Sequence, residues 1–329
     1  MRRPAILALL VLLAAAVLAL APLVGAGGLG PAGLWEGEPV ARRIFWSLRV
    51  PRVLLGLLAG MALAAGGMAF QALLRNPLAT PFTLGVSGGA ALGATLAIRL
   101  GWVFALFGVP AVTLLAFLGA LLAAAVVLGV GARVRDGSVA TLLLAGVAVS
   151  FTCSSLILLI HYSSDMAGSF NIVRWLMGHL DVVGGAVPAR LAPVVLVGVL
   201  LVVSQHRELD LLSLGDELAA GRGVAVRRAR WLLLVVVSLM TAAVVAACGP
   251  IGFVGMMVPH IGRLLVGPSH RWLAPVSLLL GGTLLVACDA VARVAAAPAE
   301  LPVGVVTALL GGPFFLWLLL DRRAGGGAR

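Results

Sequence analysis

The sequence predicts an all-α membrane protein of about ten transmembrane helices, and its composition and the length of its apolar segments are the observations that predict this fold. Apolar residues make up 62% of the 329 residues and charged residues only 11%, whereas the surface of a soluble domain carries far more charge. Several apolar runs reach the roughly 20 residues that a helix needs to cross about 30 Å of hydrocarbon. Residues 1–329 are therefore expected to form a single transmembrane domain.

Clusters of charge, proline and glycine divide the chain into ten candidate spans. The spans cover residues 5–25, 53–74, 83–100, 110–131, 139–160, 187–204, 231–248, 251–266, 272–292 and 303–320. An apolar stretch after a basic N-terminus also suits a signal peptide, but this one exceeds the usual h-region of about 7–15 residues and no small-x-small cleavage site follows it. A retained first span is expected, and an even number of spans places both termini on one side.

The arginines indicate which side that is. All 23 basic residues are arginine, and most lie in short segments between apolar runs. With the N-terminus inside, fifteen of the 23 fall on the cytoplasmic side, which agrees with the positive-inside rule. Both termini are therefore expected in the cytoplasm, and residues 206–230 form the longest cytoplasmic stretch. Because this charge pattern is topological, the net charge of +11 does not indicate a partner among nucleic acids.

Seven different short motifs follow one another along the chain. They are N-P-L-A-T-P at residues 76–81, L-G-V-S-G-G-A at 84–90, L-L-L-A-G-V-A at 142–148, W-L-M-G at 175–178, G-P-I-G-F-V-G at 249–255, D-A-V-A-R at 289–293 and G-G-P at 311–313. With these motifs the sequence resembles the FecCD-type permeases, the type II ABC importers that serve siderophores, haem and vitamin B12. The matching strings extend over nearly the whole chain.

This resemblance implies a multi-subunit importer in the bacterial inner membrane. The expected partners are a second permease copy, two ATP-binding subunits, an extracytoplasmic substrate-binding protein and the lipid bilayer. The chain has no lysine and no G-x-x-x-x-G-K-[ST] loop, so ATP and magnesium are expected on the separate ATPase. No catalytic residue, cofactor or metal site is expected in this chain. Siderophore, haem and cobalamin permeases share these motifs, and an iron chelate is the first expectation because iron chelates dominate the family.

Three arginines, Arg49, Arg52 and Arg293, fall on the outer side against the general bias. Exposed guanidinium groups there suit the carboxylates of a docking partner, and matching arginines in the family dock the binding protein. Binding of lipid phosphate and capping of helix ends are the alternatives. Asp289 lies four residues before Arg293, so the two can pair on one helix face, and Glu300 can join them or favour a helix N-terminus.

The inner stretch 214–223 resembles the family's coupling helices, two short helices broken at glycine that fit a groove on the ATPase. The residues assigned to this contact are Leu214, Gly215, Asp216, Glu217, Ala219 and Gly223. The family usually has an apolar residue where Arg222 stands, and a solvated loop is the alternative interpretation.

A second inner segment matches the short turn that lines the family's cytoplasmic gate. Small or apolar side chains there fit a constriction that closes by contact between two subunits. An ordinary tight turn would have the same sequence. The gate or pathway residues assigned here are Ser138, Val139, Ala140 and Thr141.

Two other classes of membrane protein predict different sequences. A secondary active transporter of a small metabolite, driven by protons or sodium, predicts ionisable residues near the span centres. A membrane enzyme predicts clustered His, Asp and Glu or a Ser/Lys pair at membrane depth. Neither pattern is obvious here, so an ATP-driven importer permease is the favoured function and the secondary transporter is the alternative.

Overall fold

The computed structural model describes residues 3–25, 39–133 and 139–325, and its long helices follow the predicted spans. Seven helical regions in these ranges are long and apolar enough to cross a membrane, and the three further predicted spans correspond to α5, α13 and α15. The prediction of an all-α membrane protein of about ten helices is confirmed. These helices are α1 (Arg3–Leu20), α4 (Val50–Leu73), α5 (Val86–Arg99), α6 (Ala111–Arg133), α7 (Val139–Tyr162), α9 (Ala186–Ser204), α12 (Val226–Cys248), α13 (Val254–Val266), α14 (His270–Ala292) and α15 (Val303–Gly325).

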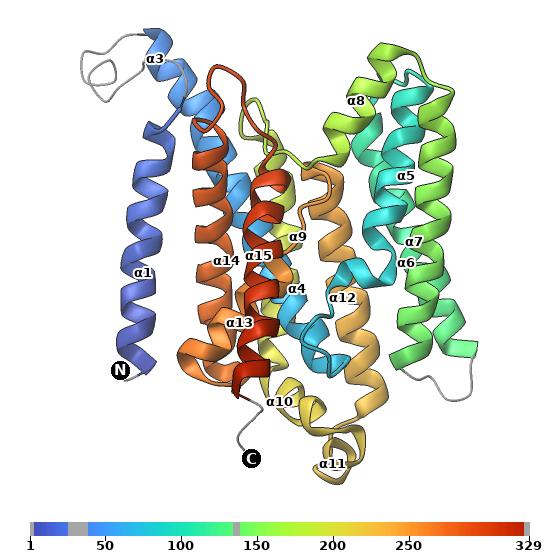
Figure 1. Ribbon diagram of the computed structural model, residues 1–329, viewed down its shortest axis with the longest axis vertical. Helices are drawn as coiled ribbons and strands as arrows, with labels where there is room; N and C mark the ends of the chain where they lie inside the picture. The colour runs from blue at the N-terminus through green and yellow to red at the C-terminus, as the bar shows by residue number, and fades with distance from the viewer. Residues whose placement is uncertain (1–2, 26–38, 134–138, 326–329) are drawn as a thin grey trace.

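Short elements connect the long helices, and several of them lie at the two ends of the bundle. At the end where both termini lie, the lower end in Figure 1, are α10 and α11. At the opposite end are α3 and α8. We call these the inner and outer ends, following the arginine topology. The short elements are η1 (Ala21–Leu23), α3 (Pro39–Ile44), the π-helical turn η2 (Phe45–Arg49), η3 (Pro81–Leu84), α8 (Met166–Leu176), α10 (His206–Leu214), α11 (Asp216–Gly221) and a hairpin of β1 (Ala105–Leu106) and β2 (Val109–Pro110).

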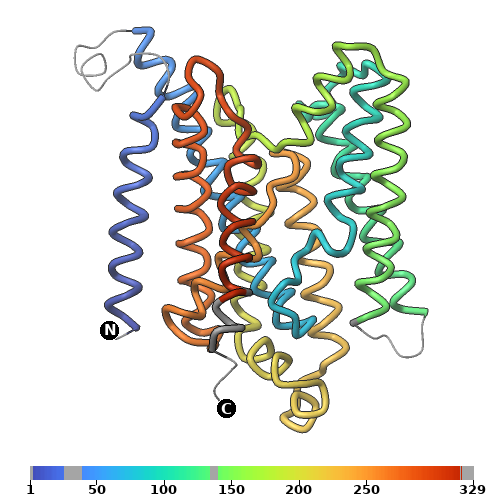
Figure 2. The backbone as a smooth tube through the Cα atoms, viewed as in Figure 1, coloured from blue at the N-terminus to red at the C-terminus, as the bar shows by residue number. Residues whose placement is uncertain are grey.

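Helix α4 is the centre of the bundle. Figure 2 shows one group of helices formed by α5, α6, α7 and α8 and another that contains α1, α14 and α15. Helix α4 packs against α9, α12, α13 and α14, and all its residues from Ala62 to Leu73 are buried. A helix that is apolar all round is typical of such a position. The α4 segment is therefore the element against which the others are arranged.

Close approach of the helices depends on glycine, which is enriched where membrane helices pack backbone to backbone. A Cβ placed on Gly60 of α4 would lie 2.2 Å from the carbonyl oxygen of Gly281 in α14. A Cβ on Gly89 of α5 would lie 2.3 Å from the carbonyl oxygen of Gly119 in α6. Because lipid supplies no hydrophobic drive for helices to associate, this backbone contact supplies van der Waals packing in its place.

Candidate functional site

At the outer end, Asp289 holds two arginines together. Its carboxylate accepts hydrogen bonds from Nε of Arg52 at 2.9 and 3.1 Å, and it pairs with Nε of Arg293 at 3.2 Å. The side chain of Asp289 is only 1% exposed, so both partners are needed to offset the cost of burying its charge. The predicted pairing of Asp289 with Arg293 along one helix face is confirmed.

Arg52 joins two further carboxylates to this cluster from loops distant in sequence. Its Nη1 lies 2.6 Å from Oε2 of Glu300 and 3.1 Å from Oδ1 of Asp181. The carboxylate of Asp181 also pairs with Arg174, whose side chain is 61% exposed. We call Arg52, Asp181, Asp289, Arg293 and Glu300 the outer network.

Arg49 and Arg293 also cap the end of the first span. Nη1 of Arg293 donates to the carbonyl oxygen of Val24 at 2.7 Å, and its Nη2 donates to that of Ala21 at 3.0 Å. Nη1 of Arg49 donates to the carbonyl oxygens of Pro22 and Leu23. The last carbonyls of a helix have no partner within the helix, and cationic side chains satisfy them. Capping of a helix end, the alternative given for these arginines, is thus observed.

All three arginines are expected to be exposed, and their observed exposure differs from residue to residue. The expectation of an exposed guanidinium is wrong for Arg293, which is 3% exposed because it lies between Asp289 and the carbonyls of η1. The side chain of Arg52 is 12% exposed and that of Arg49 is half-buried. Docking of a binding protein by these residues stays a prediction.

Two cavities open beside the outer network. The first, of about 430 Å³, is lined by Arg49, Arg52, Asp181 and Glu300 among others. The second, of about 480 Å³, shares Arg52, Asp181 and Glu300 with it and adds His179. Burial lowers the pKa of the His179 imidazole; nearby guanidinium groups act in the same direction, and Asp181 opposes them. The outer end therefore combines paired charges of both signs with open volume.

At the inner end, Gly215 separates two short helices, as the sequence predicts. Helix α10 ends at Leu214 and α11 begins at Asp216. Gly215 lies between them at a φ of 132°, which residues other than glycine rarely adopt. Ala219 is buried, while Leu214 and Leu218 are 68% and 60% exposed. Two apolar side chains thus project from the inner end, and Glu217 and Gly223 are exposed with them.

Ion pairs attach the α10–α11 segment to the spans. Asp216 pairs with Arg230 at the start of α12 at 2.8 Å. Asp210 of α10 accepts hydrogen bonds from both the backbone N–H of His270, at 2.8 Å, and its ring Nδ1, at 2.6 Å. These contacts join α11 to α12 and α10 to α14, and the coupling role of the segment stays a prediction.

The candidate gate segment is only partly visible. Ser138 lies outside the described residues, and Val139 is the first residue of α7. Ala140 is exposed and Thr141 is half-buried in the first turn of that helix. Their position at the inner end of α7 agrees with the predicted location, and their role stays a prediction.

Between the two ends, the start of α13 borders a third cavity. This cavity, of about 320 Å³, is lined by Leu63 of α4, by Leu78 and residues 80–83 around η3, and by residues 251–253, 255 and 256 before and within α13. Gln71 of α4 donates to the carbonyl oxygen of Met256 at 3.2 Å and accepts a hydrogen bond from Arg263. These contacts bridge α4 and α13, the interhelical role expected of polar groups in lipid.

Ion pairs between residues on different elements could not be predicted from the sequence. No group of three or more His, Cys, Asp or Glu side chains suited to a metal occurs among the described residues. Asp181, Asp210 and Asp216 all form ion pairs that no spacing rule predicts, because each partner lies on another element. The only available signal was that unpaired carboxylates are costly at a membrane boundary.

Comparison with known proteins shows which family has this architecture. A family model described as the FecCD transport family matches residues 9–321. The chain is 44% identical over 294 residues to the cobalamin import system permease protein BtuC of Halobacterium salinarum, covering 88% of this chain and 77% of that protein. It is 41% identical over 286 residues to the hemin transport system permease protein HmuU of Yersinia pestis, covering 85% and 84% of the two chains.

A solved structure has a similar fold over nearly the whole chain. It is described as an inward-facing conformation of a proposed metal-chelate type ABC transporter, and it matches with a TM-score of 0.86 at 33% identity, covering 97% of this chain and 99% of that one. The fold of nearly the whole chain is therefore similar to that of a solved transporter. The chain belongs to the FecCD transport family and is a membrane-spanning permease.

Proposed function

We propose that this chain is the translocation subunit of an ATP-driven importer that carries a metal chelate across the plasma membrane. The observation that carries the proposal is similarity over nearly the complete bundle, 97% of the chain, to a transporter described as of the metal-chelate type. Permeases named for cobalamin and for hemin are about equally similar, at 44% and 41% identity. Both ligands hold a metal within a large organic frame, so the similarity supports this class, and an iron chelate is the first member to test.

The proposed assembly pairs two permease copies with two ATPase subunits. ATP and magnesium bind to the ATPases, and this chain supplies no catalytic residue. The inner surface formed by Leu214 and Leu218 suits an apolar groove on each ATPase because both side chains are more than half exposed. The contacts of Asp216 with Arg230 and of Asp210 with His270 support transmission of ATPase movement into the spans. Residues 138–141, at the inner end of α7, form the proposed gate.

On the outer side, a substrate-binding protein docks over the outer network. Arg49, Arg52 and Arg293 all line the first cavity. Because Arg49 and Arg52 are more exposed than Arg293, they are the cations of the predicted set that a carboxylate on the partner reaches. Arg293 is buried and acts by holding Asp289 and the end of the first span. Both termini lie in the cytoplasm in this orientation.

Co-purification with the ATPase tests the inner surface. Replacing both leucines, Leu214→Ser and Leu218→Ser, removes two side chains whose burial is worth about 1.5–3 kcal/mol each. We expect the variant to fold and to lose its ATPase during affinity purification. The matched control is Ser213→Ala, an exposed position beside Leu214 in α10 whose hydroxyl donates to the backbone of the same helix. Full retention of the ATPase by the double variant would refute the proposed contact.

A further inference from the structure

A groove on the side of the bundle lies apart from the surfaces described so far. It has a volume of about 280 Å³ and runs between α6, α9 and α12. The side that α12 contributes is formed by Ala243, Ala246 and Ala247, and these small side chains leave the groove hollow. The remaining walls are Val109, Pro110, Thr113, Leu114, Phe117, Val187, Leu191 and Val194, with Arg190 as the one charged lining residue.

Arg190 is held at the outer end of this groove. It is exposed in the second turn of α9, and its Nη1 donates to the carbonyl oxygen of Gly108 in the β1–β2 hairpin. A guanidinium carries five N–H donors, so donors are left for a second acceptor. No Asp or Glu in the described ranges lies within ion-pair distance of Arg190, in contrast to Arg52, Arg174, Arg230 and Arg293.

The hairpin beside Arg190 has the character of a membrane interface. Val103 and Phe107 are 98% and 92% exposed, and Trp102, Phe104 and Leu106 are also exposed. Aromatic side chains are enriched where headgroups meet hydrocarbon, and an exposed apolar cluster of this size is a sign of contact with a partner or a membrane. The outer end of the groove therefore lies at headgroup depth, with its apolar walls below.

We infer that this groove binds one anionic phospholipid, with the phosphate on Arg190 and an acyl chain against the alanines of α12. A guanidinium binds phosphate through paired, charge-assisted hydrogen bonds. The apolar walls match an acyl chain, and the headgroup cation stands at the end where the hairpin marks the interface. Lipid binding at this site requires only that the chain is embedded in a membrane. The inference therefore does not depend on which substrate is transported.

Native mass spectrometry of the delipidated full-length protein, titrated with phosphatidylglycerol or phosphatidylcholine, tests this site. We expect phosphatidylglycerol to be retained preferentially and Arg190→Ala to weaken its binding about tenfold, the effect of losing a charge-assisted hydrogen bond. Ala243→Leu is a second variant, at a half-buried position, that fills the groove and leaves the cation in place. It is expected to weaken the binding of both lipids.

Arg99→Ala is the matched control, because Arg99 is another exposed arginine at the outer end that does not line the groove. It should leave lipid binding unchanged. Equal retention of the two lipids by the unaltered protein, or unchanged phosphatidylglycerol binding in both groove variants, would overturn the inference. A shift in oligomeric state with Ala243→Leu and no change in lipid binding would also overturn it, since a second protein chain would then occupy the groove.

Discussion

Asp289 is the residue on which the outer network depends. It is the most deeply buried carboxylate of the cluster, and it contacts Arg52 of α4 and Arg293 at the end of α14. Through Arg293 it also reaches the carbonyls of η1 at the end of the first span. One side chain thus links α1, α4 and α14 at the outer end.

Asp289→Asn is expected to destabilise the protein by about 3 kcal/mol, because it leaves the buried guanidinium of Arg293 without a counter-charge. The loss is at the low end of the usual range since Arg52 retains Asp181 and Glu300. The midpoint of thermal unfolding in detergent measures the effect. Glu300→Gln is the control: the side chain of Glu300 is 43% exposed, and exposed pairs contribute about 0–1 kcal/mol. Similar losses for the two variants would show that burial does not set the strength of the pair.

The sequence allows part of this network to be predicted. The spacing of Asp289 and Arg293 on one helix indicates their pairing. The meeting of Arg52 with Asp181 and Glu300 depends on how two outer loops return over α4, which no local rule determines. The burial of Arg293 was missed for the same reason: topology places it at the outer end, and only the position of η1 covers it.

Among the helices, the long spans were predictable and the short ones less so. Apolar length and the arginines between spans identify α1, α4, α6 and α7 within a few residues. Helix α8 lies between the predicted spans 139–160 and 187–204, where no helix is predicted, although the side chain of Asp165 caps its N-terminus by accepting a hydrogen bond from the N–H of Gly168. Its 11 residues are too few to produce a span signal, and its amphipathic pattern is the cue that identifies it.

The contact between α4 and α14 gives a prediction at the scale of helices. Gly60→Ala would place a methyl group 2.2 Å from the backbone oxygen of Gly281, and neither backbone can yield without separating the helices. We expect a loss of about 1–3 kcal/mol in stability, typical of overpacking, measured by thermal unfolding. Gly129→Ala in α6 is the matched control, because no atom lies within 4 Å of its added Cβ. That change should be neutral or slightly stabilising, since alanine favours a helix. Equal effects would refute the close contact.

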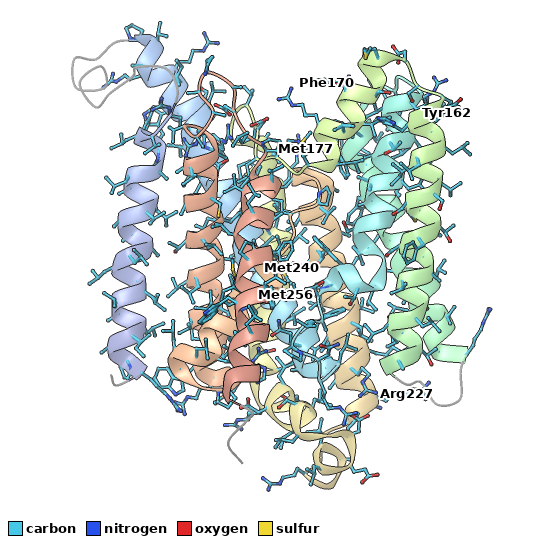
Figure 3. All side chains as sticks on the ribbon, in the orientation of Figure 1. Tyr162, Phe170, Met177, Arg227, Met240 and Met256 are labelled. Carbon is cyan, nitrogen blue, oxygen red and sulfur yellow. The ribbon has the colours of Figure 1, made fainter. Side chains whose placement is uncertain are left out.

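For the whole molecule, the orientation in the membrane is open to a direct test. Tyr162 and Arg227 lie at opposite ends of the bundle in Figure 3, and both are exposed. The native cysteines Cys153, Cys248 and Cys288 are buried and unpaired, so they give little background reaction. An impermeant maleimide should label Tyr162→Cys in intact cells and label Arg227→Cys only after permeabilisation. The reverse pattern would place the termini outside.

The arrangement of charge explains why the bundle suits a passive translocation subunit. The described ion pairs gather at the two ends, at the outer network and at the α10–α11 segment. The third cavity, beside α13, is mostly apolar in its lining. The proposed function assigns the driving force for transport to partner subunits, and this assignment is its central claim.

Transport into vesicles tests this claim most directly. The chain is reconstituted into proteoliposomes with its ATPase and binding protein, and uptake of a radiolabelled ferric siderophore, haem or cobalamin is measured with and without ATP. We predict uptake of one of these metal chelates that requires ATP and is lost when the ATPase is omitted. Uptake that persists without ATP and follows a proton or sodium gradient would contradict the account.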